Sequence, residues 1–132
     1  MELISNKVTI STDKETIKNF LILPSNLWHL LPQDKVSEFK SDESGCSFKV
    51  QGGIVISLVN NGTTENTLLL KSGEKTPFPF ELTIHLEENS GSTEGYIAFK
   101  GEVNMFLKMM IEKPLSALFN YMSEKLKDQF EK

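Results

Sequence analysis

The chain has 132 residues, 39% of them hydrophobic and 24% charged, and a formal net charge of −4 at pH 7. This length and composition are typical of one soluble globular domain with a sizeable core. All 14 basic residues are lysine and they form no cluster. The chain therefore lacks the guanidinium groups that usually recognise phosphates and base edges, and we expect no nucleic-acid partner.

Cysteine usage and hydropathy indicate the compartment. Cys46 is the only cysteine, which excludes an internal disulfide and is typical of proteins from a reducing compartment. Residues 1–8 lack the long apolar run of a signal peptide, and no apolar run in the sequence is long enough to span a bilayer. We therefore expect a cytoplasmic protein without a membrane span.

One strand and two short helices are predicted at the start of the chain. Apolar and polar residues alternate over residues 4–11, which indicates a strand with one buried face. Residues 12–15 have the Thr-x-x-Glu pattern of a capping box, so a helix is predicted to start there and to end before Pro24. A second short helix is predicted over residues 26–31, ending at Pro32.

Six strands joined by short turns are predicted next. The turn signals are Gly52-Gly53 and residues 60–62, Asn-Asn-Gly, where glycine allows positive φ. Short turns join antiparallel neighbours, so the six strands should form a meander. The predicted strands cover residues 36–41, 46–50, 54–59, 66–71, 80–87 and 94–103.

A long amphipathic helix is predicted over residues 105–130, and it is the only element long enough to cover the apolar face of the sheet. Pro114 lies inside the pattern and should kink the helix or restart it. The predicted apolar stripe is Leu107, Ile111, Pro114, Leu118, Met122 and Leu126, and the polar side is Glu112, Ser116, Asn120, Ser123 and Lys127.

This order of elements resembles the helix-grip fold of the START-like, birch-pollen-allergen-like superfamily (SRPBCC, including polyketide cyclase-like proteins). The resemblance covers the whole chain, and it includes Leu30-Leu31-Pro32 after the short helices and residues 101–104 before the long helix. It implies a single α+β domain over residues 1–132, in which a curved antiparallel sheet (β-α-α-β6-α order) grips a long C-terminal helix.

The resemblance also implies a deep cavity between the sheet and the helix for a small hydrophobic molecule, lipid- or polyketide-like. Our leading interpretation is a carrier or sensor that binds such a ligand without catalysis. His29 could donate to a polar group of the ligand or lie at the surface, and Tyr121 could supply a hydroxyl. The candidate ligand-binding residues are Trp28, His29, Phe48, Ile56, Phe80, Leu82, Ile84, Phe99, Met110, Pro114 and Leu118.

Two alternatives stay open. A cyclase- or hydrolase-type enzyme would need an ionisable group inside the cavity, and the side chains that decide this are His29, Glu38, Glu94 and Glu102. We single out no catalytic residue, and the absence of Cys-x-x-Cys or His-rich spacing leads us to expect no metal and no cofactor.

The other alternative is an interaction module with a filled core, which would bind a protein partner or form a homodimer. Two prolines flank Phe78, which should keep this segment out of a central strand and place the ring at an exposed rim. The first turns of the long helix could form a second apolar surface, made of Met105, Phe106 and Met109.

Overall fold

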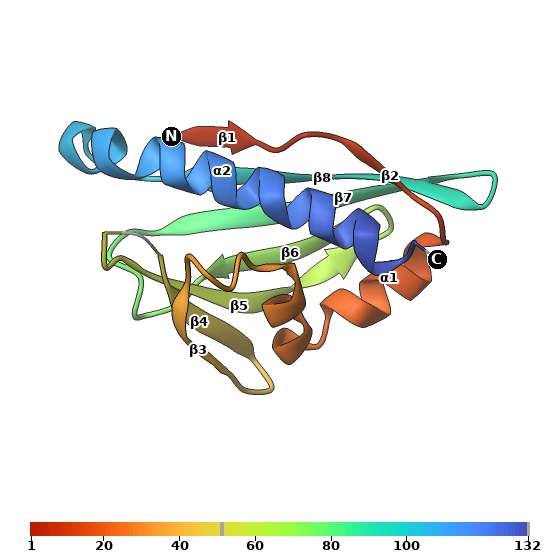
Figure 1. The fold of residues 1–132 in the computed structure, drawn as a ribbon, viewed down its shortest axis with the longest axis horizontal. Coiled ribbons are helices and arrows are strands. Elements are labelled where there is room, and N and C mark those ends of the chain that lie inside the picture. Colours follow the sequence, from red (N-terminus) through yellow and green to blue (C-terminus); the bar gives the residue numbers. More distant parts are fainter. Residues whose placement is uncertain (51, 132) are drawn as a thin grey trace.

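The computed structural model describes residues 1–50 and 52–131. Within these ranges the chain forms eight strands, two α-helices and one 3₁₀ helix (Figure 1). The elements are β1 (Glu2–Ile4), β2 (Val8–Ile10), α1 (Lys14–Leu21), η1 (Pro24–Leu30), β3 (Ser37–Ser41), β4 (Gly45–Lys49), β5 (Val55–Thr64), β6 (Thr67–Ser72), β7 (Phe80–Asn89), β8 (Ser92–Gly101) and α2 (Met105–Gln129).

The strands form one antiparallel sheet, in the order β1-β8-β7-β6-β5-β4-β3, with β2 also paired to β8. Consecutive strands from β3 to β8 are neighbours, as expected of a meander with short turns. The long helix α2 lies along one face of the curved sheet (Figure 1). The predicted α+β class, with a curved antiparallel sheet and a long C-terminal helix, is confirmed.

The core lies between the sheet and α2. On β7 the apolar residues Phe80, Leu82, Ile84 and Leu86 are all buried, and the polar residues between them are exposed or half-buried. This follows from the two-residue period of a strand, which sends alternate side chains to opposite faces. The side chains of α1 and η1 close the same core from the side, through Ile17, Leu21, Leu27 and Leu30.

The helix α2 is continuous over 25 residues, so the chain does not restart at Pro114. Its first free amides are capped by Asn104, whose Oδ1 accepts a hydrogen bond from the Leu107 amide at 2.8 Å. Ser123, predicted on the polar side, is buried, and its hydroxyl donates to the Asn120 carbonyl at 3.0 Å. That bond removes the cost of burying the hydroxyl. The buried stripe is Ile111, Leu115, Leu118, Phe119, Met122, Ser123 and Leu126.

The prediction of one continuous strand over residues 4–11 is wrong, because the segment forms two strands, β1 and β2. The predicted sides of Ile4 and Ser5 are wrong as well. From Ile4 to Val8 the chain advances four positions, whereas the partner strand advances three, from Ala98 to Gly95. The extra residue makes a bulge at which Ser5 turns inward and Ile4 is 69% exposed. The Ser5 hydroxyl accepts a hydrogen bond from the amide of Ile97 at 2.8 Å, so it takes the place of a backbone carbonyl in the ladder.

The predicted turn at residues 60–62 is also wrong, because β5 continues to Thr64. The pairing with β6 shifts between Asn60 and Thr63, and Gly62 there has φ of +96°. Gly62 therefore lies at a bulge within a strand. A bulge of this kind and a tight turn both need a residue with positive φ, so the same sequence signal fits either. The two-residue signal Gly52-Gly53 does lie in the β4–β5 turn, with φ of +92° and +80°.

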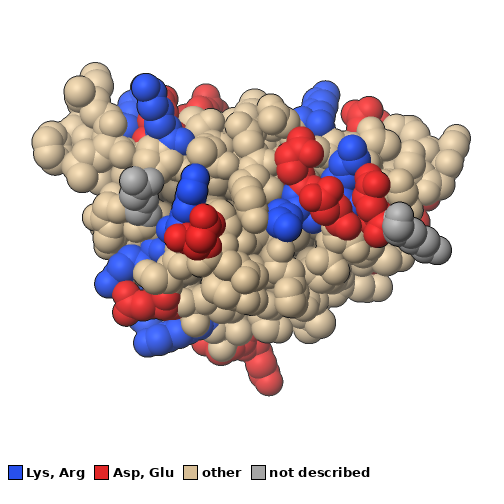
Figure 2. Space-filling model, viewed as in Figure 1, with Lys and Arg blue, Asp and Glu red and all other residues tan. Residues whose placement is uncertain are grey.

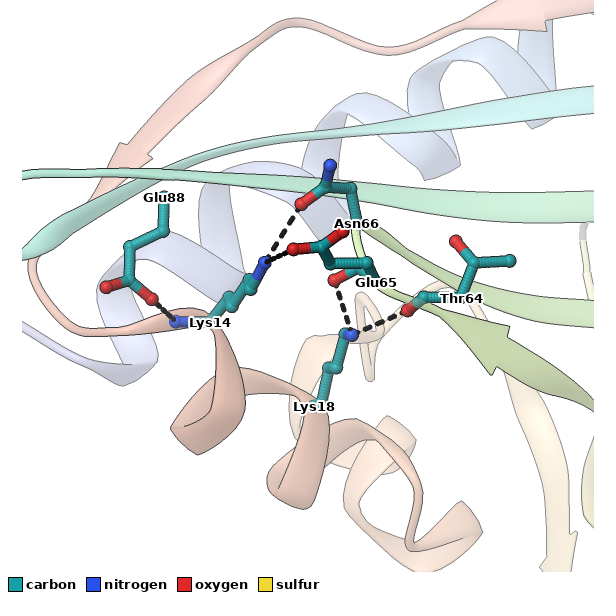
Figure 3. Close-up of polar contacts among 6 residues, drawn as sticks. All are labelled: Lys14, Lys18, Thr64, Glu65, Asn66 and Glu88. Carbon is teal, nitrogen blue, oxygen red and sulfur yellow. Dashed lines mark hydrogen bonds and ion pairs between the residues drawn. The ribbon is translucent and has the colours of Figure 1, made fainter.

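The helix α1 begins at Lys14 after Asp13, without a side-chain cap, so the predicted capping box does not form. It is fixed instead to the β5–β6 turn by two lysines (Figure 3). The buried Lys18 donates from Nζ to the carbonyls of Thr64 and Glu65, both at 2.7 Å. Lys14 Nζ donates to Asn66 Oδ1 at 3.0 Å.

Candidate ligand-binding site

An apolar pocket of about 120 Å³ lies between α2 and two loops that face it. One loop follows η1, and the other follows β4. The residues that line the pocket are Pro32, Lys35, Val36, Val50, Pro114, Ala117, Leu118 and Tyr121.

Local structure explains how these residues meet. The amides of Lys35 and Val36 both donate to the Pro32 carbonyl, at 2.8 and 3.1 Å, so this loop is a tight turn. That turn buries Val36 and leaves Lys35 exposed. On α2 the lining residues are spaced by three and four positions from Pro114 to Tyr121, which places them on one face of the helix.

The polar groups of the pocket are few. Of the eight described residues that line it, Lys35 alone is charged. Tyr121 brings a hydroxyl, and its ring lies 5.8 Å from the Nζ of Lys125, one helical turn further on. The lining of the pocket is therefore mostly apolar, with hydrogen-bond donors from Lys35 and Tyr121.

Outside this pocket, the core between the sheet and α2 contains a cluster of aromatic rings. The ring of Phe99 has its centre 5.1 Å from that of Phe80, 5.3 Å from that of Phe119 and 6.4 Å from that of Phe78. These are the distances of aromatic rings in contact. These four rings therefore fill part of the space between the sheet and α2, where the resemblance implied a deep cavity.

The sequence matches no family model and no curated protein. The fold is similar to several solved structures. The protein TTHA0849 from Thermus thermophilus has a TM-score of 0.76 at 13% identity, with 98% of this chain and 97% of that chain covered. A START superfamily protein from Mycobacterium smegmatis has a TM-score of 0.68 at 14% identity, with 98% and 96% covered. Truncated norcoclaurine synthase from Thalictrum flavum has a TM-score of 0.67 at 12% identity, with 98% and 93% covered.

The chain has a START-like helix-grip fold. At these identities the likeness establishes the architecture, and function has to be argued from the site of this chain. The START-like fold does place α2 across the sheet in the way that the sequence predicted.

The fold brings only two of the eleven candidate residues, Pro114 and Leu118, to the pocket. Six others lie in the packed core and are at most 5% exposed. Their period-two pattern identified them as inward-facing, but inward-facing residues line a cavity only where their neighbours leave space. These six are Phe48, Ile56, Phe80, Leu82, Ile84 and Phe99.

The remaining three candidates do not line the pocket. Trp28 is half-buried, with its ring 5.3 Å from that of Phe39. His29 is exposed beside Phe20. Met110 is 50% exposed, because the first turns of α2 project past the end of the sheet (Figure 1). The candidate residues did not include Pro32, Lys35, Val36, Val50 and Ala117. Pro32 and Lys35 lie in a loop without a hydropathy period. Val36 and Val50 fall in the predicted strands 36–41 and 46–50, but in the structure they lie just outside β3 and β4.

The four ionisable side chains on which the enzyme alternative depends, His29, Glu38, Glu94 and Glu102, are all exposed. Glu38 is paired with Lys49 at 2.7 Å, and the hydrogen bond from that ammonium lowers the pKa of the Glu38 carboxyl. None of the four is in the apolar pocket. The condition for acid–base chemistry in the pocket is therefore not met by these groups.

Two further observations concern chemistry at other places. Burial raises the pKa of the Cys46 thiol to about 12, so the thiol stays protonated at neutral pH and is a poor nucleophile. Over residues 1–50 and 52–131, no three His, Cys, Asp or Glu side chains are placed to hold a metal ion. None of the helices in those ranges has the length and hydropathy that crossing a membrane requires.

Phe78, predicted at an exposed rim, is 5% exposed, and that prediction is wrong. Its ring lies 5.9 Å from that of Phe80, so the segment between β6 and β7 is anchored into the core. The other predicted apolar surface is present. Met105, Phe106 and Met109 are 74%, 74% and 79% exposed.

Proposed function

We propose that this START-like chain binds a small apolar ligand in the pocket under α2 and does no chemistry on it. The single observation that supports this most is the apolar lining beside Pro114 and Leu118. Among the described residues of this lining, Lys35 and Tyr121 are the ones with an ionisable side chain. A concave, mostly apolar site with few polar groups is typical of small-molecule binding. A cytoplasmic location belongs to the same proposal, because the one cysteine is buried and free.

The size of the pocket limits the ligand. A cavity of about 150 Å³ accepts one benzene ring, so about 120 Å³ fits one small ring or a short alkyl chain. Pockets that hold larger, drug-sized ligands have volumes of about 300–1,000 Å³. For such a ligand, α2 would have to move away from the two loops.

Toluene is a suitable probe of this proposal, followed by amide chemical shifts. Burial of about 150 Å² of apolar surface gives on the order of 4 kcal/mol before the cost of association is subtracted, so we expect a dissociation constant of about 1 mM or weaker. Ala117→Phe should weaken toluene binding at least about tenfold, because Ala117 is exposed and borders the pocket, which the larger side chain would fill.

Asp128→Phe, an exposed position on the same helix outside the pocket, is the matched control and should leave toluene binding unchanged. If toluene causes no shift changes around the pocket, or binds Ala117→Phe as it binds the wild type, the proposed site is wrong.

The exposed apolar surface on α2 favours a second candidate function, an interaction module that pairs with a second copy of this chain. Met105, Phe106 and Met109 all belong to the first two turns of the helix. The corresponding end of the molecule carries almost no charged atoms in the view of Figure 2, whereas acidic and basic side chains mix over the rest of this face. A contiguous exposed apolar surface is a common mark of an interface.

Sedimentation velocity tests the second candidate. Phe106→Lys should shift a concentration-dependent dimer to monomer, because a lysine in the interface would be desolvated. Ile22→Lys changes an equally apolar, 49% exposed residue elsewhere and should have no effect. A wild-type protein that stays monomeric at all concentrations contradicts this candidate.

A further inference from the structure

The pocket under α2 has a positive edge, and we propose that its ligand is an amphipathic anion, a small apolar group that carries a carboxylate held at Lys35. This inference rests on the proposed function and names the class of ligand for the same site. It starts from the chemistry of the lining, in which six apolar residues are joined by Lys35 and Tyr121.

The two polar side chains are available to a ligand. Among the described residues, Lys35 Nζ and the Tyr121 hydroxyl form no hydrogen bond, and Lys35 forms no ion pair. Both border one small volume, so a single molecule of one ring and a short arm can reach both. Lys125, whose Nζ lies 5.8 Å from the centre of the Tyr121 ring, adds a second positive charge just outside.

The acidic residues next to Lys35 and Lys125 in the sequence do not neutralise the positive charge at the pocket. Asp34 precedes Lys35, and Glu124 precedes Lys125, but both are exposed and neither borders the pocket. Of the described residues that line the pocket, Lys35 is therefore the one that brings a charge. Because Lys35 is exposed, a neutral ligand would leave its ammonium to water, whereas an anionic ligand would pair with it.

A carboxylate fits these donors better than a phosphate does. A lysine ammonium is a point charge with three donors, and a phenol adds one more, which suits a singly charged group. Phosphate is usually held by arginine forks or several backbone amides, and this sequence contains no arginine. At the rim the carboxylate also keeps part of its hydration, so the cost of its desolvation is small.

Phenylacetate and its neutral isostere phenylacetamide test the inference, with amide shifts of the pocket residues measured at pH 7. We expect the wild type to bind phenylacetate about fivefold more tightly than phenylacetamide, the preference that one partly exposed charged hydrogen bond gives. Lys35→Gln should abolish this preference, because the side chain that carries the charge at the pocket is replaced by a neutral one. Lys35 is exposed, so the substitution should not affect folding.

Lys71→Gln is the matched control, because Lys71 is also exposed, lies on β6 outside the pocket and carries the same charge. It should keep the full preference. Equal binding of both probes by the wild type, or an unchanged preference in Lys35→Gln, would overturn the inference and leave the proposed function intact. Absence of binding by both probes would overturn the inference, and absence of toluene binding as well would overturn the proposed function with it.

A third probe, octanoate, identifies the apolar part of the ligand. Binding that depends on Lys35 and is tighter for octanoate than for phenylacetate supports an acyl chain on the anion. The reverse order supports a ring. With either order, anion binding that is weakened in Lys35→Gln and kept in Lys71→Gln upholds the carboxylate at the rim.

Discussion

Replacement of Phe99 by alanine should lower the free energy of unfolding by about 4 kcal/mol. Phe99 is 2% exposed, and its ring is in contact with those of Phe80 and Phe119, one from the sheet and one from α2. Loss of the ring removes both the transfer free energy of the side chain and the contacts of the walls that remain. Urea denaturation, followed by the fluorescence of the single tryptophan, Trp28, measures the change.

Phe106→Ala is the matched control, because the same atoms are removed from a residue that is 74% exposed. Its effect should be within about 0.5 kcal/mol. The size of the Phe99→Ala effect also reports on the core. A loss below about 1 kcal/mol would mean that Phe99 borders empty space, and the packed core described above would then be wrong.

Benzene gives a second readout of the same variant. A cavity left by Phe99→Ala should be dry and apolar, so benzene should raise the stability of the variant more than that of the wild type. An equal rise in both proteins would place the benzene site elsewhere, most simply in the pocket under α2.

The sheet could be predicted from the sequence because its signals are local. Residues Phe80, Leu82 and Ile84 alternate with polar ones, and the alternation alone decides which side of β7 is buried. The same is true of Gly52-Gly53, where two positive φ values are needed in succession. Element order then followed from the short connections.

The bulges could not be predicted because they break the same local rule. Ser5 is polar and buried because its hydroxyl pairs with the Ile97 amide, a contact with a residue 92 positions away. Gly62 has the positive φ of a turn, but the partner strand continues past it. In both cases the register of the neighbouring strand determines whether the residue lies at a bulge. A single sequence does not show that register.

The site was the least predictable part, because a cavity is the volume that side chains leave unfilled. The pattern showed that Phe48 and Phe99 face inward, but whether facing rings meet or stay apart depends on sub-ångström packing. Lys35 lies in a loop whose position is set by a tight turn, and loops carry no periodic signal. Val50 falls at the end of the predicted strand 46–50, but the alternation does not show that it borders an open volume.

Gly45→Ala should destabilise the protein by about 3 kcal/mol. A Cβ at this position would lie 2.0 Å from the carbonyl oxygen of Leu58 and 2.9 Å from the Cα of Val59, and both atoms belong to the backbone of β5. Since a side-chain rotation cannot relieve a clash with backbone, β4 and β5 would have to separate at the pair Gly45–Val59. Urea denaturation again measures the loss.

Gly95→Ala separates this clash from the general effect of adding a methyl group to a buried strand. The nearest atoms to a Cβ at Gly95 are the Cδ1 of Ile10 and the Cδ2 of Leu86, both at 3.3 Å, and such side-chain ends can move. Neither Gly45 nor Gly95 has a positive φ, so alanine should be tolerated at Gly95 at a cost below about 1 kcal/mol. Equal losses in both variants would mean that β4 and β5 are not held this closely. Because β4 leads directly to Val50 at the pocket, Gly45→Ala should also weaken toluene binding, whereas Gly95→Ala should leave it unchanged.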